Sequence, residues 1–296
     1  MGSPRGLVGP PPVRVRAGDG PWEALDTALE DGDYALAYGF LADWDPDGRT
    51  PGELTRLLGT EADRYGRLEC PEARRRFAAS RLLLKHVAAA VLRARPEELE
   101  LARHPNGRPY LRGCGQLEVS LSHTGTALAV GLSRRGPIGV DIEPSGRTVY
   151  GTGLEEEVCT GHERSQLGWL PEPERNGAVI RLWTLKEAYS KALGHGLRLP
   201  FRSFGFTTPL TATAVPRLLA VDGTPADDVG WQFETHPLAD GYTLSTAVSP
   251  PGTGPGAPQP TEAGDLLDKT MTSAVLGCYR KDDPQPAGAH APGRSG

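Results

Sequence analysis

The alternation of apolar and polar positions predicts a chain in which strands and helices are interspersed. Residues 34–41 are rich in aromatic and aliphatic side chains and follow an Asp-Gly-Asp turn, which is typical of a strand. Residues 71–95 carry apolar side chains at helical spacing, and Pro96 is placed to end that helix. Two further strands are expected at residues 117–121 and 127–132, after an Asn-Gly-Arg-Pro turn.

The second half of the chain repeats this layout without obvious residue-level similarity. A strand near residues 138–144 precedes two helical patterns and three short strand patterns. We expect helices at residues 154–167 and 178–193, and strands near residues 201–207, 230–235 and 241–248. The repeated layout predicts two α/β subdomains of similar plan that join near residues 134–137.

Composition narrows the class of protein. The 296 residues are 38% hydrophobic and 23% charged, as in an ordinary globular protein. The formal net charge of -5 argues against a nucleic-acid binder, which would carry a basic excess. Residues 64–103 are an exception, because ten basic side chains stand there against five acidic ones. Such a segment could attract a small polyanion.

The ends of the chain and its cysteines give further limits. The four cysteines are far apart and form no C-x-x-C pair, which favours a reducing, cytoplasmic setting over a zinc knuckle or a disulfide framework. We find no secretory apolar run and no apolar stretch of about 18 residues, so we expect a soluble protein. Residues 1–21 and 249–296 are rich in Gly and Pro and are expected to be flexible, which leaves subdomains at residues 22–135 and 136–248.

Two acidic residues share one face of the strand expected at residues 138–144. Side chains alternate along a strand, so Asp141 and Glu143 point one way and Val140 and Ile142 the other. Adjacent carboxylates repel unless a cation or a shared proton relieves them, and Mg²⁺ prefers carboxylate oxygens. An amphipathic strand that exposes two acids to solvent would give the same tripeptide, so a second motif is needed to choose between these interpretations.

The second motif is a helix with an aromatic ring, a carboxylate and an ammonium on one stripe. Trp183, Glu187 and Lys191 are spaced at i, i+4 and i+8, and Lys186 lies about 100° round the helix from Glu187. A Glu–Lys pair at this spacing is also a routine feature of helix surfaces, and tryptophan is common in cores. The helix alone therefore leaves both interpretations open.

Taken together, the two motifs resemble the surfactin-synthetase-activating (Sfp) type of 4′-phosphopantetheinyl transferases. That family carries a G-[IV]-D-[IVL]-E strand and, some way downstream, a W-x-x-K-E-[AS]-x-x-K-x-x-G helix. Both are present without a mismatch at residues 139–143 and 183–194. The turn at residues 106–109 and the arginine-led helical segment at residues 81–84 also resemble the family.

A fifth segment resembles the family with a departure. Residues 119–124 read Val-Ser-Leu-Ser-His-Thr, which is similar to the family's F-N-[IV]-S-H-[ST] block but lacks its aromatic residue and asparagine. The departure puts in doubt only the local packing around a bound nucleotide.

The resemblance implies both a fold and a reaction. The fold would be α+β (α/β), with two similar subdomains in a pseudo-twofold arrangement, each a small and mainly antiparallel sheet packed on a long helix, and with the active site in the cleft between them. The reaction would be that of a holo-[acyl-carrier-protein] synthase: transfer of the 4′-phosphopantetheine group of coenzyme A to a serine of an apo acyl or peptidyl carrier protein, with release of 3′,5′-ADP. Such enzymes activate polyketide, non-ribosomal peptide or fatty acid synthases.

The resemblance also implies a metal site and a general base. Asp141, Glu143 and Glu187 would hold Mg²⁺, for which Mn²⁺ could substitute, and the metal would neutralise the diphosphate of coenzyme A. Glu187 is the first candidate for the base that accepts the serine proton, and Lys186 is the second. Lys191 would pair with a phosphate oxygen.

Coenzyme A would need cations of its own. Arg81 and His123 match the 3′-phosphate site best, with Arg108 nearby and Arg76 as a further candidate, because guanidinium groups suit phosphate oxygens. The full set of expected coenzyme A contacts is Arg76, Arg81, Arg108, Ser122, His123, Asp141, Lys186 and Lys191.

Two other functions would use the same residues. One is a different Mg²⁺-dependent phosphoryl transferase or nuclease, and the other is a catalytically silent module that binds coenzyme A or a carrier protein. The expected partners are coenzyme A and apo carrier domains, with no nucleic acid and no membrane, and the chain is expected to be a monomer.

Overall fold

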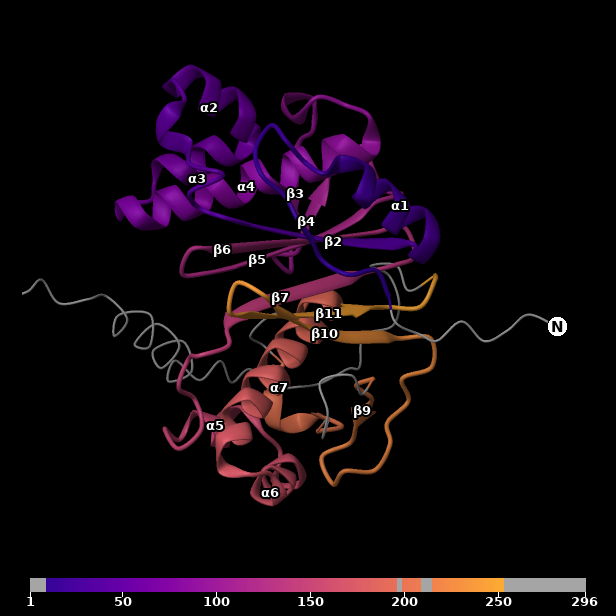
Figure 1. Ribbon diagram of the computed structural model, residues 1–296. Coiled ribbons are helices and arrows are strands. Elements are labelled where there is room, and N and C mark those ends of the chain that lie inside the picture. The colour runs from indigo at the N-terminus through magenta and orange to yellow at the C-terminus, as the bar shows by residue number, and fades with distance from the viewer. Residues whose placement is uncertain (1–8, 196–198, 209–214, 253–296) are drawn as a thin grey trace, which may run out of the picture. The chain divides into compact units, whose positions relative to one another are not determined.

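The computed structural model describes residues 9–195, 199–208 and 215–252. Its helices are α1 (Trp22–Gly32), α2 (Pro51–Leu58), α3 (Ala62–Gly66), α4 (Pro71–Leu92), α5 (Leu154–Val158), α6 (Gly161–Trp169) and α7 (Glu172–Leu193). Short 3₁₀ helices are η1 (Pro46–Gly48), η2 (Gly59–Glu61), η3 (Pro96–Glu98) and η5 (Phe201–Ser203). The strands are β1 (Val13–Arg14), β2 (Tyr34–Phe40), β3 (Leu101–Arg103), β4 (Pro109–Leu111), β5 (Glu118–Thr124), β6 (Ala127–Ser133), β7 (Ile138–Pro144), β8 (Gly205–Phe206), β9 (Leu218–Leu219), β10 (Gln232–Leu238) and β11 (Tyr242–Val248) (Figure 1).

Most of these strands belong to two sheets. The larger has the order β1-β2-β6-β5-β4-β3, in which β1 runs parallel to β2 and the other neighbours are antiparallel. The smaller is antiparallel with the order β10-β11-β7, and β8 pairs with β9 separately. The larger sheet ends at Ser133 and the smaller begins at Ile138, so the chain changes sheet where the two halves were expected to join. The mixed fold with mainly antiparallel sheets confirms the predicted fold class.

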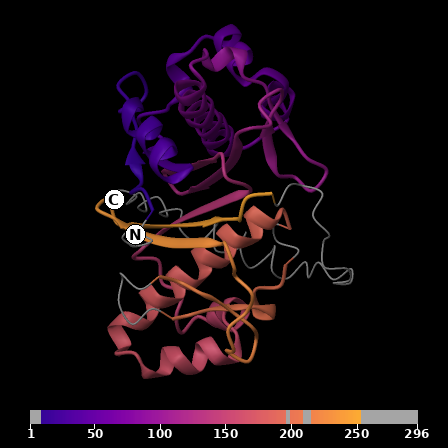
Figure 2. The ribbon, with the colours of Figure 1, turned by 90° about the vertical axis from the view of Figure 1, so that its right-hand side faces the viewer.

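The two sheets pack face to face between two long helices. Side chains of β2 and β6 form one buried cluster with Ile138, Val140 and Ile142 of β7 and with Leu244 and Val248 of β11. Helix α4 covers the outer face of the larger sheet and α7 the outer face of the smaller one, as Figures 1 and 2 both show. Burial of these apolar faces, at about 25 cal/mol per Å², is what holds the four layers together.

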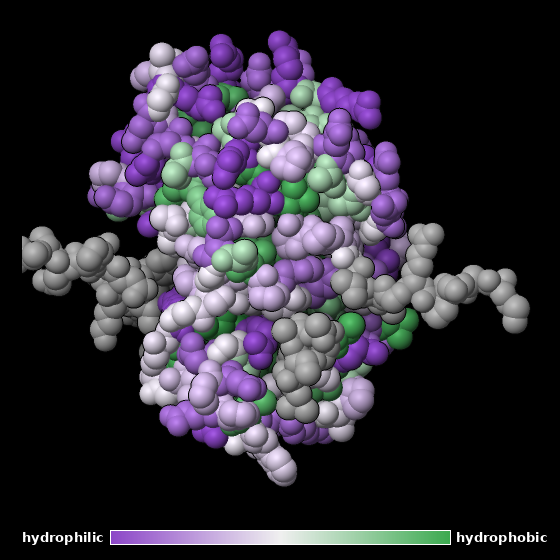
Figure 3. Space-filling view, in the orientation of Figure 1, coloured by the Kyte–Doolittle hydropathy of each residue, from purple (hydrophilic) through white to green (hydrophobic). Residues whose placement is uncertain are grey.

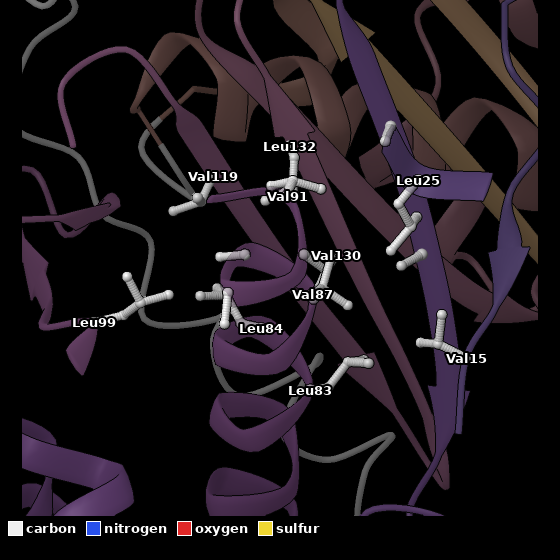
Figure 4. Close-up of a cluster of buried hydrophobic side chains, with 14 of the residues drawn as sticks. Val15, Leu25, Leu83, Leu84, Val87, Val91, Leu99, Val119, Val130 and Leu132 are labelled. Carbon is white, nitrogen blue, oxygen red and sulfur yellow. The ribbon is translucent and has the colours of Figure 1, made fainter. Parts of the chain in front are cut away.

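Helix α4 shows how the predicted periodicity is used. Its apolar side chains pack against strands of the larger sheet, as Figure 4 shows for Leu83, Leu84, Val87 and Val91 opposite Val119, Val130 and Leu132. The helix ends at Leu92, three residues before the expected end. The reason is that Arg93 adopts a left-handed conformation with φ of 53°, from which its N–H is donated to the carbonyls of Ala89 and Ala90.

Helix α7 lies unusually close to β7. A Cβ atom at Gly139 would overlap the backbone carbonyl oxygen of Ala188, so that only glycine allows the helix to pack at this distance. The glycine of the acidic strand motif therefore has a packing role. It brings the carboxylates of β7 next to the polar stripe of α7.

Several predicted boundaries are wrong in informative ways. The helix expected at residues 154–167 is two helices, because Thr160 caps α6 through a capping box with Glu163. Helix α7 begins at Glu172 rather than at residue 178. The strand expected at residues 201–207 is mostly the 3₁₀ turn η5, followed by the two-residue strand β8.

The expected flexible N-terminal segment is also shorter than predicted. Val13 and Arg14 form β1, and Val15 is completely buried beside them. An apolar residue at every second position, separated by arginines, explains this short edge strand. The predicted C-terminal tail lies outside the described residues from 253 onward.

The surface agrees with the composition. Hydrophilic residues cover much of the face in Figure 3, and apolar residues reach it only in small groups. Within the described ranges, no helix combines the length and the apolar character needed to cross a bilayer.

Candidate active site

The two acids of β7 face away from the sheet–sheet core, as the alternation predicted. Val140 and Ile142 are fully buried between the sheets. Asp141 and Glu143 point toward α7 and are 5% and 7% exposed. Because β7 is an edge strand of its sheet, these carboxylates can also meet side chains of β5 in the neighbouring sheet.

Asp141 is held by one residue from β5 and one from α7. Its Oδ1 accepts hydrogen bonds from Lys191 Nζ at 2.6 Å and from Ser122 Oγ at 2.7 Å. Lys191 also donates to Ser122 Oγ and to the Val140 carbonyl, so its three N–H groups all have partners. Burial opposes the charge of Lys191, but Asp141 and Glu187 raise its pKa above the ordinary value, which keeps it an ammonium.

Glu143 has a similar pair of donors. Its Oε2 accepts hydrogen bonds from Arg147 Nη1 at 2.9 Å and from Thr124 Oγ1 at 3.1 Å. The guanidinium of Arg147 also lies 4.8 Å from the centre of the Trp183 ring. Burial and the charge of Asp141 raise the pKa of Glu143 to about 7 despite the opposing charge of Arg147.

Glu187 completes the acidic group from α7. Trp183 lies one helical turn earlier and favours the charged form of Glu187. Burial and the charge of Asp141 raise the pKa of Glu187 to about 7. A carboxylate with a pKa near neutrality is suited to accept a proton at physiological pH.

The donor set fits a hard divalent cation. Among the described residues, no three His, Cys, Asp or Glu side chains are grouped closely enough to hold a metal ion as they stand. However, Oδ2 of Asp141 is buried and has no hydrogen-bond partner among the described residues, and the charge of Asp141 adds to burial in raising the pKa values of Glu143 and Glu187. A bound cation would give this buried oxygen a partner and would offset the repulsion between the carboxylates.

His123 lies next to Ser122 on β5, with cationic side chains around it. Its Nδ1 is buried and has no hydrogen-bond partner in the part of the chain that the structure describes. Burial and the charges of Arg81, Lys191 and Arg76 lower the pKa of His123 to about 4, so the ring is neutral at pH 7. The structure thus brings together four of the residues expected to bind coenzyme A.

The arginines of this group differ in how firmly they are already paired. Arg81 is 4% exposed, donates to Glu61 at 2.8 Å and stacks on Phe77 at 3.8 Å. Burial lowers the pKa of Arg81 to about 10, so it remains charged. Arg76 has no ion-pair partner among the described side chains.

Arg108 lies at the turn before β4. It donates to Glu118 at 2.6 Å, and its Nε is buried with no hydrogen-bond partner within the described ranges. Its side chain approaches Gly194 at the end of α7, which places it near the same end of that helix as Lys191.

Lys186 is not part of this group, contrary to its predicted place in catalysis and coenzyme A binding. Its side chain is completely buried on another side of α7, and its ammonium donates to Glu163 at 2.6 Å. It also donates to the carbonyls of Val158, Phe201 and Phe204. An ammonium enclosed by four acceptors cannot reach a substrate, so the role of Lys186 here is structural.

Sequence reasoning assigned no role to several residues that hold this site. Thr124 follows the recognised Ser-His pair on β5, and its hydroxyl points to Glu143 because residues 120, 122 and 124 share one face of the strand. Arg147 lies in a loop, where no periodicity indicates its direction. Glu61 and Glu163 are distant in sequence from the arginine and lysine that they neutralise.

Comparison with known proteins identifies the class. Residues 137–247 match the model of the 4′-phosphopantetheinyl transferase superfamily, and residues 42–133 match that of the 4′-phosphopantetheinyl transferase N-terminal domain. The chain belongs to the 4′-phosphopantetheinyl transferase superfamily, as the two motifs predicted, and is similar to its Sfp-type members.

Individual relatives agree with this assignment. A protein of Synechocystis sp., assigned provisionally to the 4′-phosphopantetheinyl transferases, is 32% identical over 149 residues, which are 50% of this chain and 61% of that protein. A phosphopantetheinyl transferase of Thraustochytrium sp. is 28% identical, with 70% of this chain and 76% of that protein covered. The 4′-phosphopantetheinyl transferase psf-1 of Bacillus pumilus is 24% identical over 60% of this chain and 72% of its own length. The match thus spans less than two thirds of the first of these relatives.

Proposed function

We propose that this protein transfers the 4′-phosphopantetheine group of coenzyme A to a serine of apo acyl or peptidyl carrier proteins and releases 3′,5′-ADP. The observation that carries the proposal is the meeting of three carboxylates, Asp141, Glu143 and Glu187, beside the Ser122-His123 pair of β5. The carboxylates lie in the part of the chain that matches the superfamily model, and the Ser122-His123 pair lies in the part that matches the N-terminal model. The site therefore combines β5 of the larger sheet with β7 of the smaller sheet and with α7.

The three carboxylates would hold Mg²⁺, with Mn²⁺ as a possible substitute. The orphaned Oδ2 of Asp141 and the raised pKa values of Glu143 and Glu187 support this assignment. When bound, the cation would neutralise negative charge on the diphosphate during displacement. Deprotonated Glu143 and Glu187 are favoured once a cation offsets their repulsion from Asp141.

Glu187 is the general base in this proposal. Its carboxylate accepts the proton from the hydroxyl of the carrier serine as that oxygen attacks the β-phosphorus. In the cation-free protein, burial and the charge of Asp141 raise its pKa to about 7, which brings its proton affinity close to the working pH. Because Lys186 is enclosed by acceptors, it is not retained as the alternative base.

Lys191 orients Asp141 and supplies positive charge to the site. Since its three donors are engaged, a phosphate oxygen could bind Lys191 only by replacing Ser122 or the Val140 carbonyl. Exchange of a neutral acceptor for an anionic one would strengthen the hydrogen bond.

The 3′-phosphate of coenzyme A would bind near His123, Arg76 and Arg81, with Arg108 as a further cation. The electrostatic effect of Arg81 and Arg76 on His123 supports the proximity of these side chains. An anion bound near Arg76 and Arg81 would be attracted by their positive charges, although Glu61 already partly neutralises Arg81.

The rival functions are less well supported. A nuclease would need a nucleic-acid surface, which the net charge of -5 disfavours. A silent binding module would not need the three carboxylates. We expect the enzyme to be a monomer, and light scattering of the purified protein would test that expectation.

A mass measurement tests the proposed reaction. The purified protein is incubated with coenzyme A, Mg²⁺ and several apo carrier domains of polyketide, peptide and fatty acid synthases. We expect the carrier to gain the phosphopantetheine mass, 3′,5′-ADP to appear in equal amount, and both to depend on the divalent cation. A complete absence of modified carrier across this set would refute the proposal.

A further inference from the structure

The two carboxylates of β7 are held by the same kind of arrangement. In Asp141, Oδ1 accepts two hydrogen bonds, and Oδ2 accepts none from the residues that the structure describes. In Glu143, Oε2 accepts both the Arg147 and the Thr124 hydrogen bond, and no donor of a described residue bonds to Oε1. Each side chain thus has one oxygen fixed by the protein and one oxygen left for another partner.

The donors on Glu143 are themselves well fixed. Thr124 is 3% exposed on β5. The Arg147 side chain is 13% exposed, and its guanidinium stacks on Trp183. The Arg147 side chain is therefore largely shielded from solvent, and its ion pair with Glu143 differs from the weak pairs of exposed side chains.

The loop that carries Arg147 is held by Asn176 of α7. The Asn176 side chain accepts hydrogen bonds from the backbone N–H groups of Val149 and Tyr150 at 2.8 and 3.0 Å, and it donates to the Arg147 carbonyl at 2.8 Å. Both ends of one amide thus bind this loop. The position of Arg147 relative to α7 is set in this way.

Arg147 also connects Glu143 with the part of α7 that carries the third carboxylate, Glu187. Arg147 joins Glu143 to the ring of Trp183, and Trp183 lies one helical turn before Glu187 and favours its charged form. Glu143 and Glu187 are thereby linked by side chains other than Asp141.

We propose that Thr124 and Arg147 are positioning residues that clamp Oε2 of Glu143, so that Oε1 is the oxygen available to the divalent cation. This inference rests on the proposed function, because it concerns the same metal site. Outer partners of metal-binding carboxylates fix the ligand in its binding rotamer, and their loss typically weakens metal affinity about 10- to 100-fold.

Two substitutions test the clamp without changing the charge of the site. Thr124→Val removes the hydroxyl and keeps the shape, and Arg147→Lys keeps the positive charge but loses the planar fork. Mn²⁺ is titrated into each protein with saturating coenzyme A and no carrier, and free Mn²⁺ is measured by electron paramagnetic resonance. We expect each variant to bind Mn²⁺ at least about tenfold more weakly than the wild type.

A double-mutant cycle separates positioning from general damage. In a Glu143→Gln background, Thr124→Val and Arg147→Lys should have no further effect on Mn²⁺ affinity, because the clamped carboxylate is gone. Thr126→Val and Arg217→Lys are matched controls, since they alter a hydroxyl contact with Tyr242 and an ion pair with Asp228 outside the acidic group. They should bind Mn²⁺ as the wild type does.

Each outcome decides the proposal. Wild-type Mn²⁺ affinity in both clamp variants would overturn it, and so would equal losses in the wild-type and the Glu143→Gln backgrounds. Neither result would affect the proposed function if the wild type still modified carriers. Failure of the wild type both to modify carriers and to bind Mn²⁺ would overturn the proposed function and the clamp with it.

Discussion

The ammonium of Lys191 lies 2.6 Å from Oδ1 of Asp141, although the two residues are 50 positions apart in the chain. The contact joins α7 to β7 at the centre of the acidic group. It gives a buried carboxylate a partner of opposite charge, while the second oxygen of that carboxylate has no hydrogen-bond partner among the described side chains and backbone groups. The balance of charge in this small region underlies most of the predictions below.

Removal of the ammonium should be costly. In Lys191→Met, Asp141 would be a buried charge next to two other carboxylates, and we expect the free energy of unfolding to fall by about 3–5 kcal/mol. Urea denaturation would measure this loss. The double variant with Asp141→Asn should recover most of it, and a double variant as unstable as the single one would contradict the ion-pair explanation.

Glu187→Gln should abolish transfer without loss of stability. The substitution removes a group whose pKa is raised by burial and by Asp141, so like-charge repulsion in the cation-free protein decreases. We expect an unchanged or higher melting temperature together with a loss of turnover of at least about a hundredfold. Retained turnover at high Mg²⁺ would tell against Glu187 as base and ligand.

Lys186→Met should act on folding rather than directly on chemistry. It would leave Glu163 as a buried, unpaired carboxylate at the start of α6, at a cost of about 3–5 kcal/mol. The double variant Lys186→Met, Glu163→Met should regain stability and, with it, transfer activity. A stable double variant with no activity would show that Lys186 has a chemical role after all.

His123 should make the protein less stable in mild acid. Its pKa is lowered to about 4 in the folded state from an ordinary value near 6.5, so the unfolded chain binds the proton more tightly. The resulting penalty is absent above about pH 6.5 and grows as the pH falls toward 4. Urea unfolding from pH 7.5 to 4.5 should show a shallower decline for His123→Asn than for the wild type, and equal declines would contradict the prediction.

Arg76→Ala should weaken coenzyme A more than its 3′-dephospho form. Arg76 contributes positive charge at His123 and has no ion pair with a described side chain, so an incoming phosphate need not displace a carboxylate. We expect KM for coenzyme A to rise about tenfold and KM for the dephospho form to change little, as for loss of one charge-assisted hydrogen bond. Arg75→Ala is the control, because Arg75 is already paired with Asp45. Equal changes for both substrates would remove Arg76 from the phosphate site.

Local patterns of apolar and polar residues predicted much of the secondary structure. The apolar spacing of α4 and the alternation along β7 predicted their elements, because a period of 3.6 or of 2 follows directly from backbone geometry. Boundaries were less accurate where a single side chain decides them. Thr160 divides the helix expected at residues 154–167 by capping α6, and Arg93 ends α4 early by adopting a left-handed conformation.

The sequence by itself determined the chemical groups and the family, since Gly139, Asp141, Glu143 and Glu187 stand in two specific local motifs. Only the tertiary structure decided how these groups are used. In the folded protein, Lys186 is surrounded by four acceptors and Lys191 is paired with Asp141. Thr124 and Arg147 both donate to one oxygen of Glu143. The physical reason is that burial and pairing arise when separate elements pack together, and no spacing within one strand or helix specifies which side chain of another element will lie opposite.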